Sequence, residues 1–235
     1  MSQSQELENL EKKKKTYFTK LLKPFVKLPT ERFSAYSHLF GMILSIIGTI
    51  LLAIRAIGDP TGMFLCFIYG FSNIFLFFSS TMTHSQRTTE DSHDIWTMLD
   101  KIAIYFLIAG TYTAVVYYYL TGAWRLGIII AQWIFASIGS LLTILEIRTP
   151  RWITAGIYLV QGWMIIAVVN RIFSAMFWGD FLLIMIAGLS YSGGTIFYIT
   201  KKPKLWPGKF GPHDLWHISV LIGATLFYFI LWRAV

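Results

Sequence analysis

Residues 33–54 read FSAYSHLFGMILSIIGTILLAI and contain no Asp, Glu, Lys or Arg. The hydrocarbon core of a bilayer is about 30 Å thick, and an α-helix of about 20 apolar residues crosses it. This stretch is long enough to do so, and it lacks the charged face of a helix that lies between a protein core and water. It therefore predicts a membrane-spanning helix.

The same pattern recurs along the rest of the chain. Six further uncharged intervals follow, at 60–86, 102–124, 126–145, 152–170, 181–200 and 215–232. A transmembrane barrel would instead show alternating segments of about ten residues. Gly-Asp-Pro at 58–60 and Leu-Thr-Gly at 120–122 predict tight turns. We therefore predict an all-α polytopic membrane protein, with a seven-transmembrane helix bundle over residues 32–235 and a tail at 1–31.

The composition supports a membrane protein. Hydrophobic residues make up 55% of the 235 residues and charged residues only 14%, whereas a soluble domain is about 25% charged. Too little polar surface remains to cover a globule in water. Cys66 is the single cysteine, which excludes an internal disulfide and a cysteine-based zinc site. Any metal chemistry must therefore use histidines and carboxylates.

Lysine and arginine are unevenly shared between alternate connections, and this bias sets the orientation of a membrane protein. With the N-terminus inside, the outer side holds only Arg55, Arg125, Arg171 and Arg233. The inner connections hold Arg87, Arg148, Arg151, Lys201, Lys202, Lys204 and Lys209. No cleavable signal peptide is visible. We therefore predict an integral, multi-pass membrane protein with its N-terminus inside and its C-terminus outside.

The tail at 1–31 is basic and amphipathic. Lysines at 12–15, 20 and 23 alternate with apolar side chains, namely Tyr17, Phe18, Leu21 and Leu22. Such segments bind anionic lipid headgroups when they lie next to a span. We expect the tail to lie on the inner leaflet. Nucleic-acid binding or a partner helix is less favoured, because polybasic residues before a span already have a positional explanation.

All five histidines fall at or near the predicted inner side, which indicates a polar site within the membrane. His213 and His217 are four residues apart at the start of the last span, so their rings share one helical face and can bind one ion. His84 ends the second span. We expect His93, in a polar loop, to be solvated.

Two polar side chains are predicted to lie close to these histidines. Ser80 lies one turn before His84 on the same helical face, and Asp100 starts the third span. Three neutral imidazoles with one open position are the ligand set of a catalytic zinc ion. Asp100 could then orient the metal-bound water or act as its base, and Ser80 could bind a ligand or a developing oxyanion.

A structural interpretation fits the same residues. The histidines could bind backbone groups or lipid headgroups at the interface. Asp100 could be a helix N-terminal charge that the macrodipole favours, and Ser80 could be a helix-packing residue. Spacing alone leaves both interpretations open.

Three blocks of the sequence match a known family. They are FSSTMTH at 78–84, LDK at 99–101 followed by IAGTYT at 108–113, and GPHDLWH at 211–217. They resemble the signature blocks of the haemolysin III family, the bacterial branch of the progestin and adipoQ receptor (PAQR) group, and the resemblance covers about residues 31–234. It implies seven helices in a bacterial inner membrane and a Zn²⁺ ion near the cytoplasmic face, held by His84, His213 and His217 beside Asp100 and Ser80.

The first span departs from the pattern of this family. The family often opens with Glu, followed shortly by Asn and then by Thr-His. Here Ser34 follows Glu31, and Ser37-His38 takes the place of the later pair. The missing Asn puts any role of this helix entry in doubt. For His38 we weigh a partner of Asp100 against an interfacial residue, and we favour the interfacial residue.

The resemblance implies three classes of function. The wider superfamily includes alkaline ceramidases, so the first is a zinc-dependent intramembrane hydrolase of a lipid amide or ester. The second is a non-catalytic sensor of membrane state, or homeostasis protein, with structural zinc. The third is a membrane-permeabilising haemolysin, which we rank last because seven unbroken spans without a secretion signal describe a resident membrane protein.

Overall fold

The computed structural model describes residues 25–89, 94–147 and 150–235. Within these ranges the chain is helical and forms no strand, apart from an isolated bridge between Trp206 and Phe210. A short 3₁₀ turn, η1 (Pro29–Glu31), leads into the first long helix. The helices are α2 (Arg32–Arg55), α3 (Pro60–Gln86), α4 (Ile95–Tyr119), α5 (Gly122–Ile144), α6 (Arg151–Gly162), α7 (Val169–Ala175), α8 (Trp178–Thr200) and α9 (Pro212–Ala234).

Seven spans in the described residues are long and apolar enough to cross a membrane. This confirms the all-α, seven-transmembrane prediction. Both predicted turns are confirmed as well. Asp59 caps α3 by accepting a hydrogen bond from the Thr61 backbone N–H at 3.1 Å, and Gly122 starts α5 at a positive φ of 59°, which glycine adopts without steric cost. The predicted tail lies mostly at 1–24, outside the described residues.

The third span differs from the uncharged interval 102–124. It begins earlier, at Ile95, because Asp94 caps it by accepting a hydrogen bond from the Thr97 backbone N–H at 2.9 Å. It ends at Tyr119, before the turn at 120–122. Asp100 and Lys101 are therefore inside the helix rather than at its start. The prediction that Asp100 starts the span is wrong, because these two charges do not end the helix.

The fifth span is interrupted, although the sequence predicts one interval at 152–170. After α6 the chain tightens into a 3₁₀ segment, η2 (Trp163–Val168), and then continues as α7. The hydroxyl of Tyr112, from α4, donates to the carbonyl of Gly162 at 2.6 Å and accepts from the backbone N–H of Ile165 at 2.8 Å. A side chain inserted into the backbone ladder is a recognised cause of a helix break.

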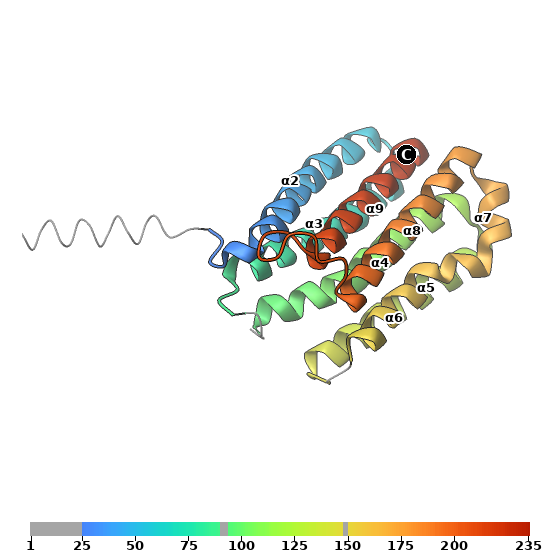
Figure 1. Ribbon diagram of the computed structural model, residues 1–235. Coiled ribbons are helices and arrows are strands. Elements are labelled where there is room, and N and C mark those ends of the chain that lie inside the picture. The colour runs from blue at the N-terminus through green and yellow to red at the C-terminus, as the bar shows by residue number, and fades with distance from the viewer. Residues whose placement is uncertain (1–24, 90–93, 148–149) are drawn as a thin grey trace, which may run out of the picture.

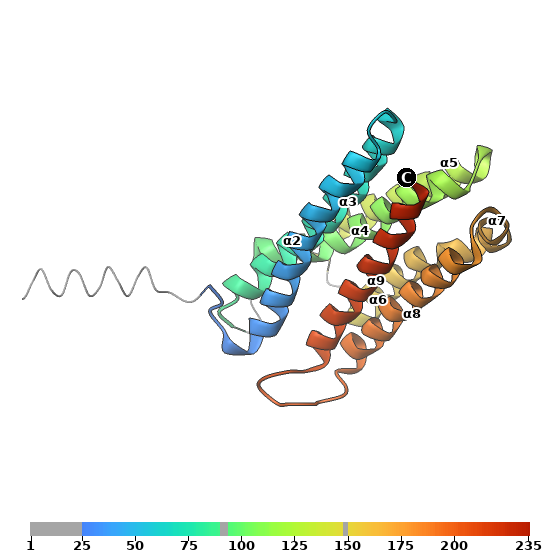
Figure 2. The ribbon, with the colours of Figure 1, turned by 90° about the horizontal axis from the view of Figure 1, so that it is seen from above.

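The helices form a closed bundle (Figures 1 and 2). Contacts run from α2 to α3, α4, α5, α6, α8 and α9 in turn, and α9 returns to α2. α4 also touches α6 and α9, and it is the most buried of the spans. Large apolar side chains on the outer faces are exposed, as a lipid environment allows, for example Ile43, Phe64, Leu126 and Ile134.

One end of the bundle gathers the starts of α2, α4 and α9 with the end of α3. The C-terminus lies at the opposite end (Figure 1). This arrangement follows from the up-and-down order of the spans, and it brings together residues that are far apart in the sequence. The predicted site residues all lie at the end that is opposite the C-terminus.

Candidate metal centre

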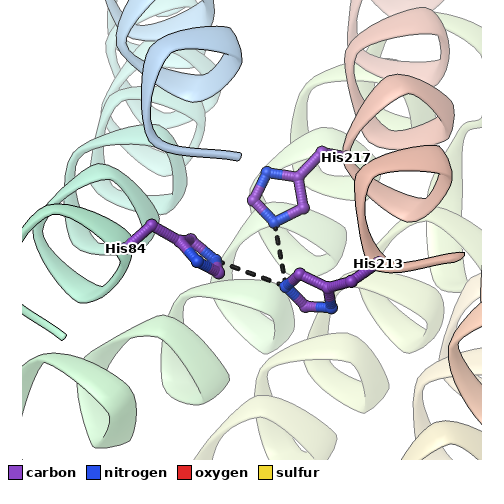
Figure 3. A group of neighbouring side chains, drawn as sticks. All are labelled: His84, His213 and His217. Carbon is purple, nitrogen blue, oxygen red and sulfur yellow. Dashed lines mark hydrogen bonds between the residues drawn. The ribbon is translucent and has the colours of Figure 1, made fainter. Parts of the chain in front are cut away.

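Three histidine side chains converge at this end of the bundle (Figure 3). The Nε2 atom of His213 lies 3.3 Å from Nε2 of His84 and 3.2 Å from Nε2 of His217. One ligand atom of each lies within 4.8 Å of the others. Zn–N bonds of about 2.0–2.1 Å in a tetrahedron place neighbouring nitrogens about 3.3 Å apart. Two of the three separations therefore match the edge of a tetrahedral site.

The local sequence explains the placement of the pair on α9. Pro212 starts the helix, where its missing N–H costs nothing. The Asp214 carboxylate accepts a hydrogen bond from the backbone N–H of Gly211 at 2.8 Å and so caps the first turn. His213 and His217 follow one turn apart on a fixed helical face. His84, near the end of α3, faces them, and His84 and His217 are each only 1% exposed.

The structure brings Asp100 and Ser80 to the same place. Both line a cavity that His213 and His217 also line, and the Ser80 side chain lies next to the Asp100 carboxylate. Asp100 lies in the second turn of α4, so its interpretation as a helix N-terminal charge is wrong. The candidate ligands and the two candidate catalytic residues thus lie together at one end of the bundle.

Glu31 is the main residue that the sequence analysis missed. Its carboxylate contacts Nδ1 of His84, and its other oxygen accepts a hydrogen bond from Arg87 at 3.2 Å. The side chain of Glu31 is only 12% exposed. The one available signal was the position of Glu31 at the start of the first span, which matches the family pattern.

His38 is buried, so the prediction of an interfacial residue is wrong. It is 2% exposed, and its ring stacks on His217 with centroids 3.7 Å apart. It also packs edge-on against Phe77 and lines the cavity. His93 lies outside the described residues, so its predicted solvation stays a prediction.

The cavity extends from the histidines into the middle of the bundle. The cavity together with the open space at its mouth measures about 1180 Å³. Along α4 it reaches from Asp100 to Val116, which is about 24 Å at 1.5 Å per residue. Its walls are mostly apolar away from the histidines, with Leu107, Ile165 and Ile184 among them. The polar cluster therefore lies at one end of a long apolar chamber.

A protein-family model described as Haemolysin-III related matches residues 26–228. The chain belongs to the haemolysin III family. Among curated proteins it is 34% identical to the Hemolysin-3 homolog of Bacillus subtilis (strain 168), over 86% of this chain and 93% of that protein. It is also 34% identical to Hemolysin-3 of Bacillus cereus, over 83% of this chain and 87% of that protein.

The relationship reaches beyond bacteria. The human Monocyte to macrophage differentiation factor is 25% identical over 85% of this chain and 82% of that protein. The family model covers residues 26–228, which include His84, His213 and His217. Together with the seven apolar spans, these matches show that this haemolysin III protein is a multi-pass integral protein of a bacterial membrane. Its three clustered histidines could hold a metal ion.

Proposed function

We propose that this haemolysin III protein is a zinc-dependent hydrolase that cleaves an amide or ester bond of a membrane lipid. One observation carries the proposal: His213, His217 and Asp100 lie on the wall of the same apolar cavity. An enzyme that hydrolyses a lipid needs a metal ion or a base beside an apolar chamber for the acyl chain. In this protein the two histidines and Asp100 line such a chamber.

The donor set favours zinc. His84, His213 and His217 would be the protein ligands, and three neutral imidazoles with an open position suit Zn²⁺ better than Mg²⁺ or Ca²⁺, which prefer oxygen ligands. A zinc ion held there would polarise a carbonyl group and lower the pKa of a bound water to about 7. The distances of 3.3 Å and 3.2 Å from Nε2 of His213 to Nε2 of His84 and of His217 support this assignment.

The cavity favours a lipid substrate. The lining residues extend over about 24 Å along α4, more than the roughly 15 Å of hydrocarbon in one leaflet, so the lined path is long enough for an extended acyl chain. Apolar side chains such as Leu107 and Ile184 would contact the chain. A soluble polar substrate would need several polar recognition groups along this wall. The carbonyl of the lipid would then lie beside the histidines.

Asp100 and Ser80 have distinct roles in this proposal. Asp100 would accept the proton of the attacking water and return it to the leaving group, as a general base and then a general acid. A serine hydroxyl has one proton to donate, and Ser80 lies close enough to the Asp100 carboxylate to donate it there. We therefore assign Ser80 to orienting Asp100 rather than to binding the oxyanion.

The test uses purified, zinc-loaded full-length protein in liposomes with defined ceramides, other N-acyl lipids or phospholipid esters. Mass spectrometry detects the released fatty acid. We expect product from wild type and at least about a hundredfold less from Asp100→Asn. Glu146→Gln, which changes an exposed acidic residue far along the chain, is the matched control and should keep full turnover. Equal product from wild type and Asp100→Asn with every lipid would overturn the enzyme and favour the non-catalytic sensor.

A further inference from the structure

Glu31, which immediately precedes α2, and the first turns of α2 contact both helix ends that carry the histidines. Glu31 contacts His84 at the end of α3. Three residues later, the Ser34 hydroxyl donates a hydrogen bond to the Asp214 carboxylate at the start of α9, at 2.8 Å. His38, one further turn along, stacks on His217. Residues 31, 34 and 38 are spaced so that they share one helical face. This face therefore joins the two halves of the histidine cluster.

The contact with Glu31 determines which nitrogen of His84 carries its proton. An ionised carboxylate only accepts hydrogen bonds, so the proton of a neutral His84 belongs on Nδ1, opposite Glu31. Nε2 then presents its lone pair, and this atom lies 3.3 Å from Nε2 of His213. Only this tautomer is ready to bind a metal ion through Nε2.

Arg87 holds the carboxylate in place. Its guanidinium donates to the second oxygen of Glu31 at 3.2 Å, so the two oxygens of this partly buried acid have different partners. A buried carboxylate without a partner would be costly. Arg87 lies one turn after His84 and so keeps Glu31 against the same end of α3.

The contact with Asp214 orients the other two histidines. One carboxylate oxygen accepts from Ser34 and the other from the backbone N–H of Gly211. The start of α9 is therefore fixed relative to α2. The positions of His213 and His217 depend on the start of α9, because both residues lie within the first two turns of this helix.

We propose that Glu31 is a positioning residue for the metal centre. It selects the His84 tautomer whose Nε2 binds the ion, and together with the contact between Ser34 and Asp214 it holds the two histidine-bearing helix ends at the spacing of one ion. This rests on the metal site of the proposed function but not on hydrolysis. Carboxylates behind metal-binding histidines contribute about 10- to 100-fold to metal affinity.

The first experiment measures Zn²⁺ affinity by competition with a coloured chelator. It uses the full-length protein, purified in detergent and stripped of metal. We expect Glu31→Ala to bind zinc about 10- to 100-fold more weakly than wild type. Glu31→Gln should lose less, because its amide oxygen can still accept a hydrogen bond from Nδ1–H of His84. Glu146→Gln, the matched acid-to-amide change at an exposed site, should bind zinc like wild type.

The second experiment separates positioning from a general structural role. If Glu31 acts through His84, then nitrogen-15 NMR of the metal-free protein should show the His84 proton on Nδ1 in wild type and shared between Nδ1 and Nε2 in Glu31→Ala. An unchanged tautomer in Glu31→Ala would overturn the proposal, as would wild-type zinc affinity in this variant. A wild-type protein that binds no zinc would overturn both this proposal and the zinc site. Zinc binding without lipid hydrolysis would overturn only the enzyme.

Discussion

The hydroxyl of Tyr112 lies 2.8 Å from the backbone N–H of Ile165, at the point where the fifth span leaves its α-helical course. The same hydroxyl donates to the carbonyl of Gly162. In a bilayer no water can satisfy a broken backbone ladder, so a protein group must do so. Tyr112 thus allows the interruption, and it also forms part of the cavity wall.

Tyr112→Phe should therefore destabilise the bundle. The change leaves the N–H of Ile165 buried without its partner, which costs about 1–3 kcal/mol. Thermal unfolding in detergent measures the effect. Tyr36→Phe is the matched control, because Tyr36 is 51% exposed, and its unfolding temperature should equal that of wild type. Equal stability of the two variants would show that the interruption does not depend on Tyr112.

Metal content provides the second prediction. A three-ligand site rarely survives on two ligands, so His213→Ala or His217→Ala should lose most of the zinc. Asp100→Asn should retain it, because Asp100 is not among the three clustered ligands. Elemental analysis of the purified proteins gives zinc per chain, with about one expected for wild type. Zinc at the wild-type level in both histidine variants would remove these residues from the ligand set.

Much of the fold could be predicted from the sequence, because a bilayer excludes charge over a fixed length. This rule identified the seven spans. Residue types that favour turns identified the turns at 58–60 and 120–122. The rule of charge exclusion misplaced the start of α4, because Asp100 and Lys101 lie inside the helix. It also missed the break after Gly162. The break coincides with a contact between Ile165 and Tyr112, which lie 53 positions apart in the sequence. The local sequence around Gly162 cannot predict a contact of this kind.

The site was predictable to the extent that it lies within single helices. The spacing of His213 and His217 places both rings on one face, and the family resemblance adds His84. The role of Glu31 was missed and that of His38 was assigned wrongly, because both depend on how α2 packs against α3 and α9. Helix packing of this kind leaves no periodic signal in one sequence.

Orientation is the third prediction. The loop with Lys201, Lys202 and Lys204 should face the cytoplasm and Val235 should face outward, since positive residues stay inside. Alkaline phosphatase fused after Val235 should be active, and a fluorescent reporter that folds only in the cytoplasm should be dark there. The same pair of reporters inserted in the 201–211 loop should give the reverse result. A bright cytoplasmic reporter after Val235 would place the metal centre on the outer side.

The fourth prediction concerns Ser80. If this residue orients Asp100, then Ser80→Ala should lower the rate of lipid hydrolysis by less than Asp100→Asn does, because the base itself remains. Its zinc content should equal that of wild type. Ser79→Ala is a suitable control, since the Ser79 hydroxyl bonds to the backbone of its own helix at Phe75. Hydrolysis by Ser80→Ala that equals wild type would remove Ser80 from the catalytic residues.

The last prediction tests whether the cavity holds the acyl chain. Gly188 lines the cavity on α8, and a Cβ there would lie 3.4 Å from the Trp163 ring, an ordinary contact. A larger side chain can therefore enter the chamber without displacing the backbone. Gly188→Leu should shorten the space beyond the histidines, so that lipids with long acyl chains are cleaved at least about tenfold more slowly. Lipids with short chains should keep their rate.

This pattern separates a blocked chamber from a damaged site. Zinc content in Gly188→Leu should be unchanged, because all three histidines come from α3 and α9 and none from α8. Gly193→Leu is the matched control, since a Cβ at Gly193 meets nothing within 4 Å and this residue does not line the cavity. A uniform loss of rate for short and long chains, with zinc retained, would show that the acyl chain does not lie along this part of the cavity.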